Sequence, residues 1–251
     1  MKPDLSHLVI LITGAGRGLG RNTAQHLAAC GATVGVMDID ATAVRETRDL
    51  INNNGGKVFS YTGDVSDRDT FLAAAAAFAH ECGRIDAVIN NAMLLRYEPI
   101  EEVRGDVLDS MMGAGFKASV WGAQALLQHM DPQRGASIIN MASPVVNRGY
   151  PNTAIYSAVK SAVASLTRVL AAELGPRGVR VNAVSPGSVP TPGALGMVSK
   201  DEYARRTATI PLRRLGQEQD NANAIAFLLS QEASFINGEI LNVDGGIAAT
   251  A

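Results

Sequence analysis

Seven short apolar runs recur along the chain, and each is followed by a longer segment of helical character. The runs are five or six residues long and lie at 8–13, 33–37, 58–62, 85–90, 137–141, 179–184 and 239–243. Continuous apolar runs of this length are typical of strands that are buried on both faces of a sheet. Their alternation with helical segments predicts a doubly wound α/β fold, with a seven-stranded parallel sheet flanked by helices on both faces.

Helix signals fill the segments between these runs. Gly55-Gly56 and Gly175-Pro176 are typical helix stops. Ser66 with Asp69, and Ser199 with Glu202, have the three-residue spacing of a helix N-terminus. We therefore expect a short helix after Ser199 and longer ones at 18–29, 41–52, 66–82, 103–130, 153–174 and 217–229. No linker, repeat or low-complexity segment interrupts this order, so residues 1–251 are predicted to form a single domain.

Charge and composition exclude several classes of protein. Hydrophobic residues make up 47% of the chain and charged residues 18%, which favours a folded core over disorder. The net charge of −2 argues against a nucleic-acid partner or an anionic membrane surface. The run Leu8–Ile12 is too short for a signal-peptide core or a membrane span, so we expect a cytoplasmic protein. Cys30 and Cys82 lack metal-ligand spacing, and no metal site is expected.

A glycine-rich loop follows the first apolar run, with the sequence Thr13-Gly-Ala-Gly-Arg-Gly-Leu-Gly20. Glycines permit a tight turn and let the backbone approach a diphosphate closely. The helix that begins there presents free N–H groups to a phosphate. The loop predicts a dinucleotide site that includes Gly14, Arg17, Gly18, Leu19 and Gly20; the competing interpretation is a tight turn that binds nothing.

Asp38 lies at the end of the second apolar run, about twenty residues beyond this loop. A carboxylate at that position accepts hydrogen bonds from a ribose diol and repels a 2′-phosphate, which favours NAD over NADP. Arg17 is the opposing signal, because a guanidinium pairs well with phosphate; its alternative interpretation is an exposed loop charge.

Tyr156 and Lys160 are four residues apart, which places both on one face of a helix. A phenol titrates near pH ~10, and a nearby positive charge lowers that pKa. The pair is therefore a candidate general acid or base. Ser143 precedes Tyr156 by thirteen residues and supplies a hydroxyl.

These motifs together resemble the short-chain dehydrogenase/reductase family. The resemblance covers almost the whole chain and implies a Rossmann-type fold and a hydride-transfer activity. It rests on the glycine loop, Ser143, Tyr156 and Lys160, together with Asp64-Val65, Asn90-Asn91-Ala92, Pro186-Gly187 and Asp244-Gly245-Gly246.

The resemblance also implies roles for individual residues. Tyr156 would exchange a proton with the substrate oxygen, and Ser143 would hold that oxygen. Lys160 would bind the nicotinamide ribose and lower the pKa of Tyr156. Further cofactor contacts would come from Asp64, Val65, Asn90, Ala92, Pro186, Gly187, Val189 and Thr191. The implied activity is NAD-dependent interconversion of a secondary alcohol and its ketone.

Two residues depart from the family pattern. Met93 stands where a glycine usually follows Asn-Asn-Ala, and we expect it to alter the local wall of the pocket. Met111 aligns with an asparagine whose main-chain carbonyl usually holds a water beside the active-site lysine. The Met111 carbonyl would keep this function if the helix is kinked, and Gly113 and Gly115 favour such a kink.

The remaining expectations concern the substrate, a second interpretation and assembly. The substrate pocket is expected to be mostly apolar and lined by 93–96, 144–147, Tyr150 and 189–198, the last acting as a lid. Arg96 and Arg148 are candidates to meet a carboxylate.

Met111 motivates the alternative of an NAD-binding protein with low or no turnover, and an epimerase or dehydratase step is a third possibility. The resemblance implies a homotetramer or dimer through the helices at 103–130 and 153–174.

Overall fold

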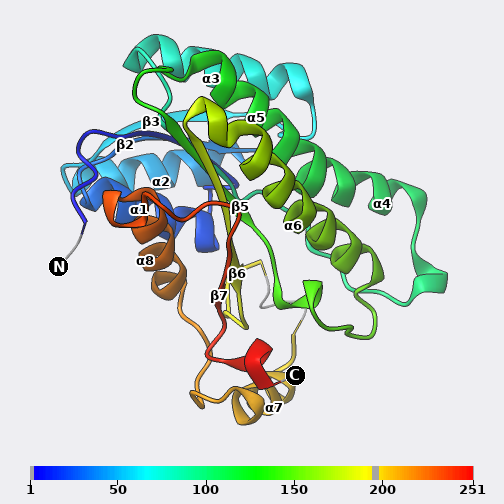
Figure 1. Cartoon of the computed structure of the whole chain (residues 1–251). Coiled ribbons are helices and arrows are strands. Elements are labelled where there is room, and N and C mark those ends of the chain that lie inside the picture. Colours follow the sequence, from blue (N-terminus) through cyan, green and yellow to red (C-terminus); the bar gives the residue numbers. More distant parts are fainter. Residues whose placement is uncertain (1–2, 194–197, 251) are drawn as a thin grey trace.

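A seven-stranded parallel sheet forms the centre of the molecule (Figure 1). The computed structural model describes residues 3–193 and 198–250. The strands lie in the order β3-β2-β1-β4-β5-β6-β7, and every neighbouring pair is parallel. This confirms the predicted doubly wound fold. The bounds of β1 to β7 are Val9–Thr13, Thr33–Asp38, Lys57–Thr62, Ala87–Asn90, Ala136–Met141, Val179–Pro186 and Ile240–Val243.

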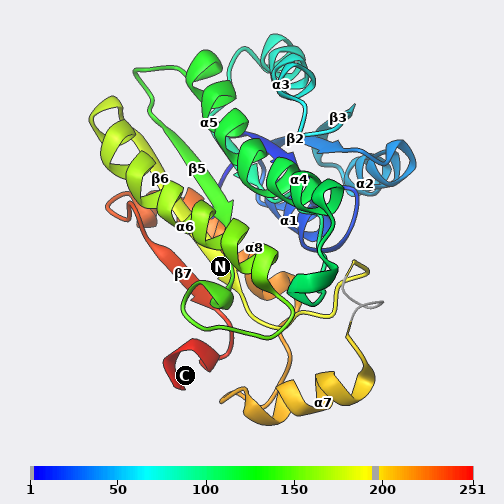
Figure 2. The same ribbon diagram turned by 90° about the vertical axis from the view of Figure 1, so that its right-hand side faces the viewer.

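Helices cover both faces of the sheet (Figure 2). Alternate residues of a strand point to opposite faces, so Ile10 and Ile12 of β1 enter one core while Val9 and Leu11 enter the other. The first core receives α1 (Gly18–Ala29), α2 (Ala41–Asn53) and α8 (Glu218–Leu229). The second receives α3 (Arg68–Cys82), α5 (Ala118–His129) and α6 (Ala154–Leu174).

Two helix starts test the predicted caps. Ser199 caps α7 (Lys200–Thr209) as predicted, because its hydroxyl accepts the N–H of Glu202 at 3.1 Å. The predicted cap at Ser66 is wrong. Asp67 caps α3 instead, with its carboxylate accepting the N–H of Thr70 at 2.7 Å.

The helix expected at 103–130 is interrupted in the structure. It consists of α4 (Gly105–Met112), a π-helical turn at Gly113–Lys117, and α5. A π turn breaks the regular hydrogen-bond ladder of an α-helix. The expected kink at Gly113 and Gly115 is therefore present, in the form of a π turn.

The strand order reverses at β1, which pairs with β2 on one side and β4 on the other. Ligands of such sheets bind beyond the carboxyl ends of the strands at this reversal. Of the helices in residues 3–193 and 198–250, none is long and apolar enough to span a membrane. Nor does that part of the chain contain a group of three or more His, Cys, Asp or Glu side chains placed to hold a metal ion.

Candidate active site

The glycine loop is packed so closely that side chains would not fit. Gly14 and Gly18 have φ angles of +63° and +56°, in the left-handed region that favours glycine. A Cβ at Gly20 would lie 2.1 Å from the Gly14 carbonyl oxygen, and one at Gly14 would lie 2.7 Å from Ala92 Cα. Arg17 precedes α1 without a side-chain cap, and the first turn of α1 carries no acidic residue. The first N–H groups of α1 thus suit an anionic ligand. Together with the glycine loop they form a cradle that fits a dinucleotide diphosphate.

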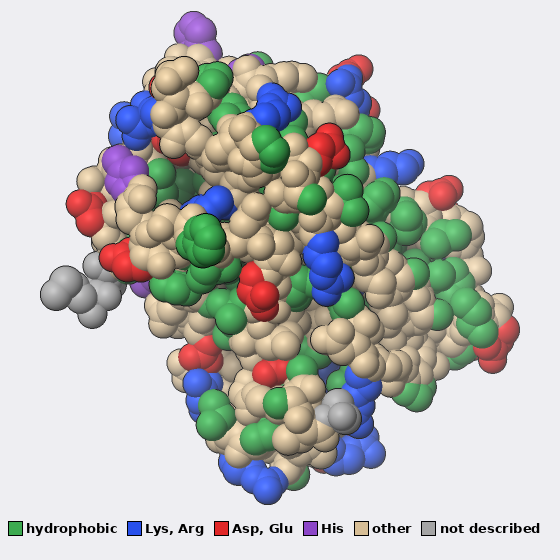
Figure 3. Space-filling view, in the orientation of Figure 1, with side chains coloured by type: hydrophobic (Ala, Val, Ile, Leu, Met, Phe, Trp, Pro, Cys, Tyr) green, Lys and Arg blue, Asp and Glu red, His purple; other side chains and the backbone are tan. Residues whose placement is uncertain are grey.

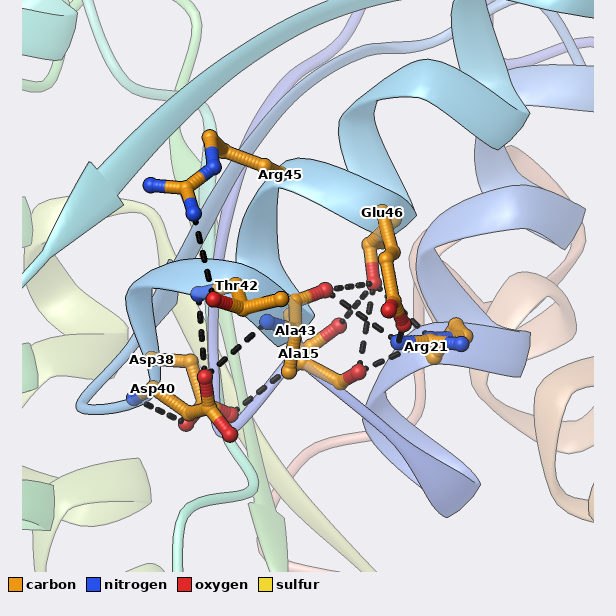
Figure 4. Close-up of polar contacts among 10 residues, drawn as sticks. Ala15, Arg21, Asp38, Asp40, Thr42, Ala43, Arg45 and Glu46 are labelled. Carbon is orange, nitrogen blue, oxygen red and sulfur yellow. Dashed lines mark hydrogen bonds and ion pairs between the residues drawn. The ribbon is translucent and has the colours of Figure 1, made fainter.

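Asp38 holds this loop from the end of β2. One carboxylate oxygen accepts the N–H of Gly16 at 2.8 Å, and the other accepts the N–H of Asp40 at 3.0 Å. A carboxylate has about four acceptor sites, so capacity remains for a ribose diol. Arg21 braces the loop from α1 by donating to the Gly16 carbonyl at 2.8 Å and to Glu46 at 2.8 Å (Figure 4).

Arg17 is exposed beside this carboxylate cluster. The pKa of Asp40 is below its ordinary value, first because the N–H groups of Ala43 and Thr42 donate to it, and then because Arg17 and Arg45 lie near. The Arg17 charge therefore acts on the carboxylate that follows β2, two residues beyond Asp38.

Thr13 and Asn91 join the glycine loop to the segment after β4. The Thr13 hydroxyl accepts the N–H groups of Asn91 and Ala92 at 3.1 and 3.2 Å. The Asn91 amide donates to the carbonyls of Thr13 and Gly14, both at 3.0 Å. Both residues belong to motifs recognised in the sequence, but their positioning role was not predicted; their polar side chains at neighbouring strand ends were the available signal.

Asn90 lies at the end of β4, but its side chain is turned into the core. The side chain is 6% exposed and donates to Asn140 at 2.8 Å. A ligand beyond the strand would therefore meet only its backbone. Val65 is also buried, whereas Asp64 is exposed and accepts the N–H of Ser66 at 2.8 Å.

Ser143, Tyr156 and Lys160 come together at the carboxyl end of β5. Ser143 follows β5 and hydrogen-bonds the phenol of Tyr156, which lies in the first turn of α6. The Lys160 ammonium lies 5.8 Å from the centroid of the Tyr156 ring and donates to the Met141 carbonyl at 2.7 Å.

Burial controls the ionisation of this group. It raises the pKa of Tyr156, and the hydrogen bond from Ser143 opposes the rise only in part. Burial also lowers the pKa of Lys160 to about 8. The Lys160 ammonium donates to the Met141 carbonyl, and desolvation is the largest influence on the pKa of Tyr156. The lowering of that pKa by Lys160 stays a prediction.

The π turn packs against α6, the helix that carries Tyr156 and Lys160. A Cβ at Gly115 would lie 2.5 Å from Val159 Cγ1 and 2.7 Å from Met93 Sδ. Glycine therefore lets the turn approach α6 next to Lys160, and Met93 fills the adjacent space. Met111 is 1% exposed in the last turn of α4, immediately before the π turn.

The segment after β6 lies against the glycine loop. The N–H of Gly187 donates to Val243 at 2.9 Å, and Val189 is 9% exposed. A Cβ at Gly18 would lie 3.3 Å from Thr191 Cβ, so Thr191 is next to the phosphate cradle. Residues 194–197 of the expected lid lie outside the described residues.

Tyr150 and Arg148 are placed differently from the expected pocket wall. Tyr150 lines an open hollow of about 550 Å³ whose lining includes none of Ser143, Tyr156 and Lys160. The Arg148 guanidinium lies 5.5 Å from the Tyr150 ring centroid, where it is engaged by the aromatic face.

Comparisons with known proteins agree with this geometry. A family model described as enoyl-(acyl carrier protein) reductase matches residues 14–248. A short-chain dehydrogenase/reductase from Serratia marcescens superposes with a TM-score of 0.92 at 28% identity, covering 98% of this chain and 99% of that one. A 7α-hydroxysteroid dehydrogenase complexed with NADH has a TM-score of 0.92 at 30% identity, covering 95% and 93%.

A third structure is described as an NAD(P)-dependent gluconate 5-dehydrogenase from Beutenbergia cavernae and contains NADP at low occupancy. It matches with a TM-score of 0.92 at 32% identity and covers 98% of both chains. The matched length, the strand order and the shared fold show that this chain is an oxidoreductase of the short-chain dehydrogenase/reductase family.

Proposed function

We propose that this protein is an NAD-dependent oxidoreductase that interconverts a secondary alcohol and its ketone. The observation that carries the proposal is the assembly of Ser143, Tyr156 and Lys160 beside the glycine cradle. The whole chain would act as one dinucleotide-binding and catalytic domain in the cytoplasm.

Tyr156 is the proposed acid and base. Because burial raises its pKa, the phenol holds its proton in the absence of ligands and is suited to donate it to a ketone oxygen. Ser143 would donate a hydrogen bond to the same oxygen and fix its position. For alcohol oxidation Tyr156 must first lose its proton, and the Lys160 ammonium would stabilise the phenolate. The bound nicotinamide would accept or supply the hydride.

The cofactor would lie across the carboxyl ends of β1, β2, β4 and β6. Its diphosphate would meet Gly14, Gly18, Leu19 and Gly20, and its adenosine would lie beside Asp38, Asp64 and Val65. The backbone at Asn90 and Ala92 would face the ribose, and Pro186, Gly187, Val189 and Thr191 the carboxamide. We favour NAD over NADP because Asp38 is negatively charged and would repel a 2′-phosphate, and the nearby charge of Arg17 is the opposing signal.

Beyond Lys160, the proposed proton route passes the Met111 carbonyl. Met111 lies in the last turn of α4, two residues before the π turn that breaks the α-helical ladder, and we propose that its carbonyl is left for a water there. A methionine side chain itself makes no comparable hydrogen bonds. The alternative of a cofactor-binding protein with low turnover rests on this substitution, and the assembled Ser143, Tyr156 and Lys160 favour the enzyme.

A screen of secondary alcohols with NAD, followed by NADH absorbance, tests the proposal. We expect turnover of some alcohols, and a loss of at least 100-fold in kcat for Tyr156→Phe, because proton transfer contributes about 10²–10⁴. NAD affinity measured by calorimetry should be nearly unchanged in that variant. NAD binding without turnover of any alcohol or ketone, and with Tyr156→Phe indistinguishable from the parent, would show that the protein is not this enzyme.

A further inference from the structure

Tyr203 of α7 carries a buried hydroxyl without a hydrogen-bond partner among the described residues. Buried phenol hydroxyls normally find a partner, so an unpaired one calls for an explanation. The helix α7 lies beyond the carboxyl ends of β6 and β7, where a substrate would be covered (Figures 1 and 2).

Tyr97 links Tyr203 to the catalytic tyrosine. Its ring meets the Tyr156 ring edge-on, with centroids 5.5 Å apart and an interplanar angle of 81°. The pKa of Tyr97 is raised, first by burial and then by its proximity to Tyr156, while Tyr203 adds to the rise and Arg206 opposes it. Tyr97 therefore lies against the Tyr156 ring, and the α7 residues Tyr203 and Arg206 are near enough to influence its charge.

Arg206 brings little free charge to this group. Its guanidinium donates to Glu202 at 2.9 Å and to the Ser188 hydroxyl at 3.1 Å. The partner carboxylate offsets the positive charge, and Ser188 fixes the side chain to the segment after β6. Figure 3 shows that Lys and Arg side chains gather on the surface at this end of the molecule, whereas the groups around Tyr97 are phenols and a compensated ion pair.

We propose that Tyr97 and Tyr203 hydrogen-bond a second, uncharged oxygen of the substrate. This inference rests on the function proposed above, and it makes the preferred substrate a vicinal diol or the corresponding hydroxyketone. The Tyr203 hydroxyl is a buried donor without a partner among the described residues, and Tyr97 carries a second phenol against the Tyr156 ring. A compensated Arg206 favours a hydroxyl or carbonyl over a carboxylate at this position.

Matched substrate pairs test the inference. The pairs are cyclohexanol with 1,2-cyclohexanediol and 2-pentanol with 2,3-pentanediol, each assayed with NAD, and the corresponding ketones with NADH. We expect the parent protein to prefer the diol of each pair in kcat/KM. Tyr203→Phe and Tyr97→Phe should each lower that preference by roughly tenfold, the effect of one lost hydrogen bond, and leave the mono-alcohol nearly unchanged.

Tyr61→Phe is the control, because it removes the hydroxyl of another partly buried tyrosine, on β3, and should leave the preference unaltered. Tyr203→Phe should also keep or raise the melting temperature, since it removes an unpaired buried hydroxyl. A fall in melting temperature would mean that the hydroxyl stabilises the fold instead, and would overturn the inference.

Four kinetic outcomes would also overturn it. The parent protein could show equal kcat/KM for the two members of each pair, or the variants could lose kcat/KM equally for both members. Either result would leave the proposed function intact and remove the role of the two tyrosines. A preference for 2-hydroxy acids that survives Tyr203→Phe would assign selection to Arg206. No turnover of any pair despite NAD binding would instead refute the proposed function, and the inference with it.

Discussion

Asp38 combines a structural and a proposed recognition role in one side chain. It accepts the N–H of Gly16 and so fixes the loop that would hold the diphosphate. Its remaining lone pairs face the position at which an adenosine ribose would lie. Arg17 lies near the same strand end and carries the opposite charge. The choice between NAD and NADP therefore depends on the balance between these two side chains.

We predict that Asp38→Ala shifts the cofactor preference toward NADP by at least tenfold. The variant removes a charge that repels the 2′-phosphate, and it also releases Gly16, so the affinity for both cofactors should fall while their ratio changes. Calorimetric dissociation constants for NAD and NADP give that ratio. Asp40→Ala is the matched control, since this neighbouring carboxylate caps α2 and makes no contact with Gly16. An unchanged ratio in Asp38→Ala would remove the residue from cofactor selection.

Lys160 is buried at 5% exposure, and its burial opposes its own charge. Its pKa falls from 10.5 in the unfolded chain to about 8 in the folded protein. Below pH 8 both states are charged, and the folded state bears the full cost of burying the ammonium. As pH rises from about 8 to 10.5, the unfolded chain binds more protons, so the free energy of unfolding increases. Above pH 10.5 the lysine is neutral in both states, so the cost of burying its ammonium is gone.

Lys160→Met should therefore increase the free energy of unfolding at pH 7 by about 1–3 kcal/mol while abolishing turnover. The gain should shrink as pH rises above about 8. Urea unfolding at pH 7 and pH 9.5 measures both effects. Lys57→Met, at an exposed position of β3, controls for the general effect of removing a lysine. A gain that is equal at the two pH values would show that charge burial is not its cause.

At the scale of elements, the π turn at Gly113–Lys117 packs against α6 at Val159, the neighbour of Lys160 in the sequence. Gly115 lies against Val159 and Met93. Gly113 lies against Ser66, since a Cβ on Gly113 would be 2.8 Å from the Ser66 Cβ. Ser66 lies just beyond Val65, at the proposed adenine end, whereas Val159 is next to Lys160, which we propose to be catalytic. The turn thus contacts both ends of the proposed cofactor site.

Gly115→Ala should destabilise the protein by about 1–3 kcal/mol and lower kcat more than NAD affinity. The added methyl would lie 2.5 Å from Val159, a stiff β-branched side chain on α6, and would push α6 away at Lys160. Thermal unfolding, kinetics and calorimetry measure the three quantities. Gly105→Ala is the control, because nothing lies within 4 Å of the added methyl in the first turn of α4. If adding Val159→Ala to this variant restores stability and kcat, the clash lies between the two side chains. An unchanged kcat in Gly115→Ala would show that the turn does not position Lys160.

The elements were largely predictable from the sequence, and the exceptions have physical reasons. Strands and helices followed from short apolar runs and their stops, because burial on both faces dictates that pattern. The glycines indicated a weakened helix, but glycine spacing alone does not distinguish a bend from a π turn. The cap at Asp67 was missed because Ser66 and Asp67 are both good caps, and packing decides between neighbouring positions.

At the scale of the whole molecule, the helices α4 and α6 leave apolar side chains at the surface. Leu108 is 37% exposed and Val169 is 56% exposed, and Ile100 in the preceding loop is 64% exposed. Figure 3 shows hydrophobic side chains gathered over this side of the molecule. A patch of this kind favours association of helices between copies, as expected for a homotetramer or dimer.

We predict a tetramer by light scattering, and a shift toward smaller species when Val169→Glu places a charge in this patch. A buried unpaired carboxylate at an interface is costly, so the change should exceed tenfold in the association constant. Leu50→Glu, at a comparable exposed position on α2, should leave the mass unchanged. A monomeric parent protein would refute the prediction.

The candidate site was predictable only where its residues follow strand ends. The glycine loop, Asp38, Ser143, Tyr156 and Lys160 all occupy such positions or the helix beside them, and chemistry restricts which residues can stand there. Tyr97, Tyr203 and Arg206 come from a loop and from α7, which fold over the site from distant parts of the chain. No periodicity marks them, so only the three-dimensional arrangement brings them to Tyr156.

The π turn also constrains which changes in length this chain can accept. A π turn accommodates one residue more than the α-helical ladder requires, so deleting a single residue within Gly113–Lys117 would restore a continuous helix. Such a deletion would leave the faces of α5 nearly in place, because the five residues of the π turn rotate the chain about as far as four α-helical residues do. Deleting one residue between Met112 and Ala118 should therefore preserve the packing of α5 on the sheet and remove only the widened turn beside α6, whereas a deletion elsewhere in α4 or α5 would turn the helix faces by about 100°.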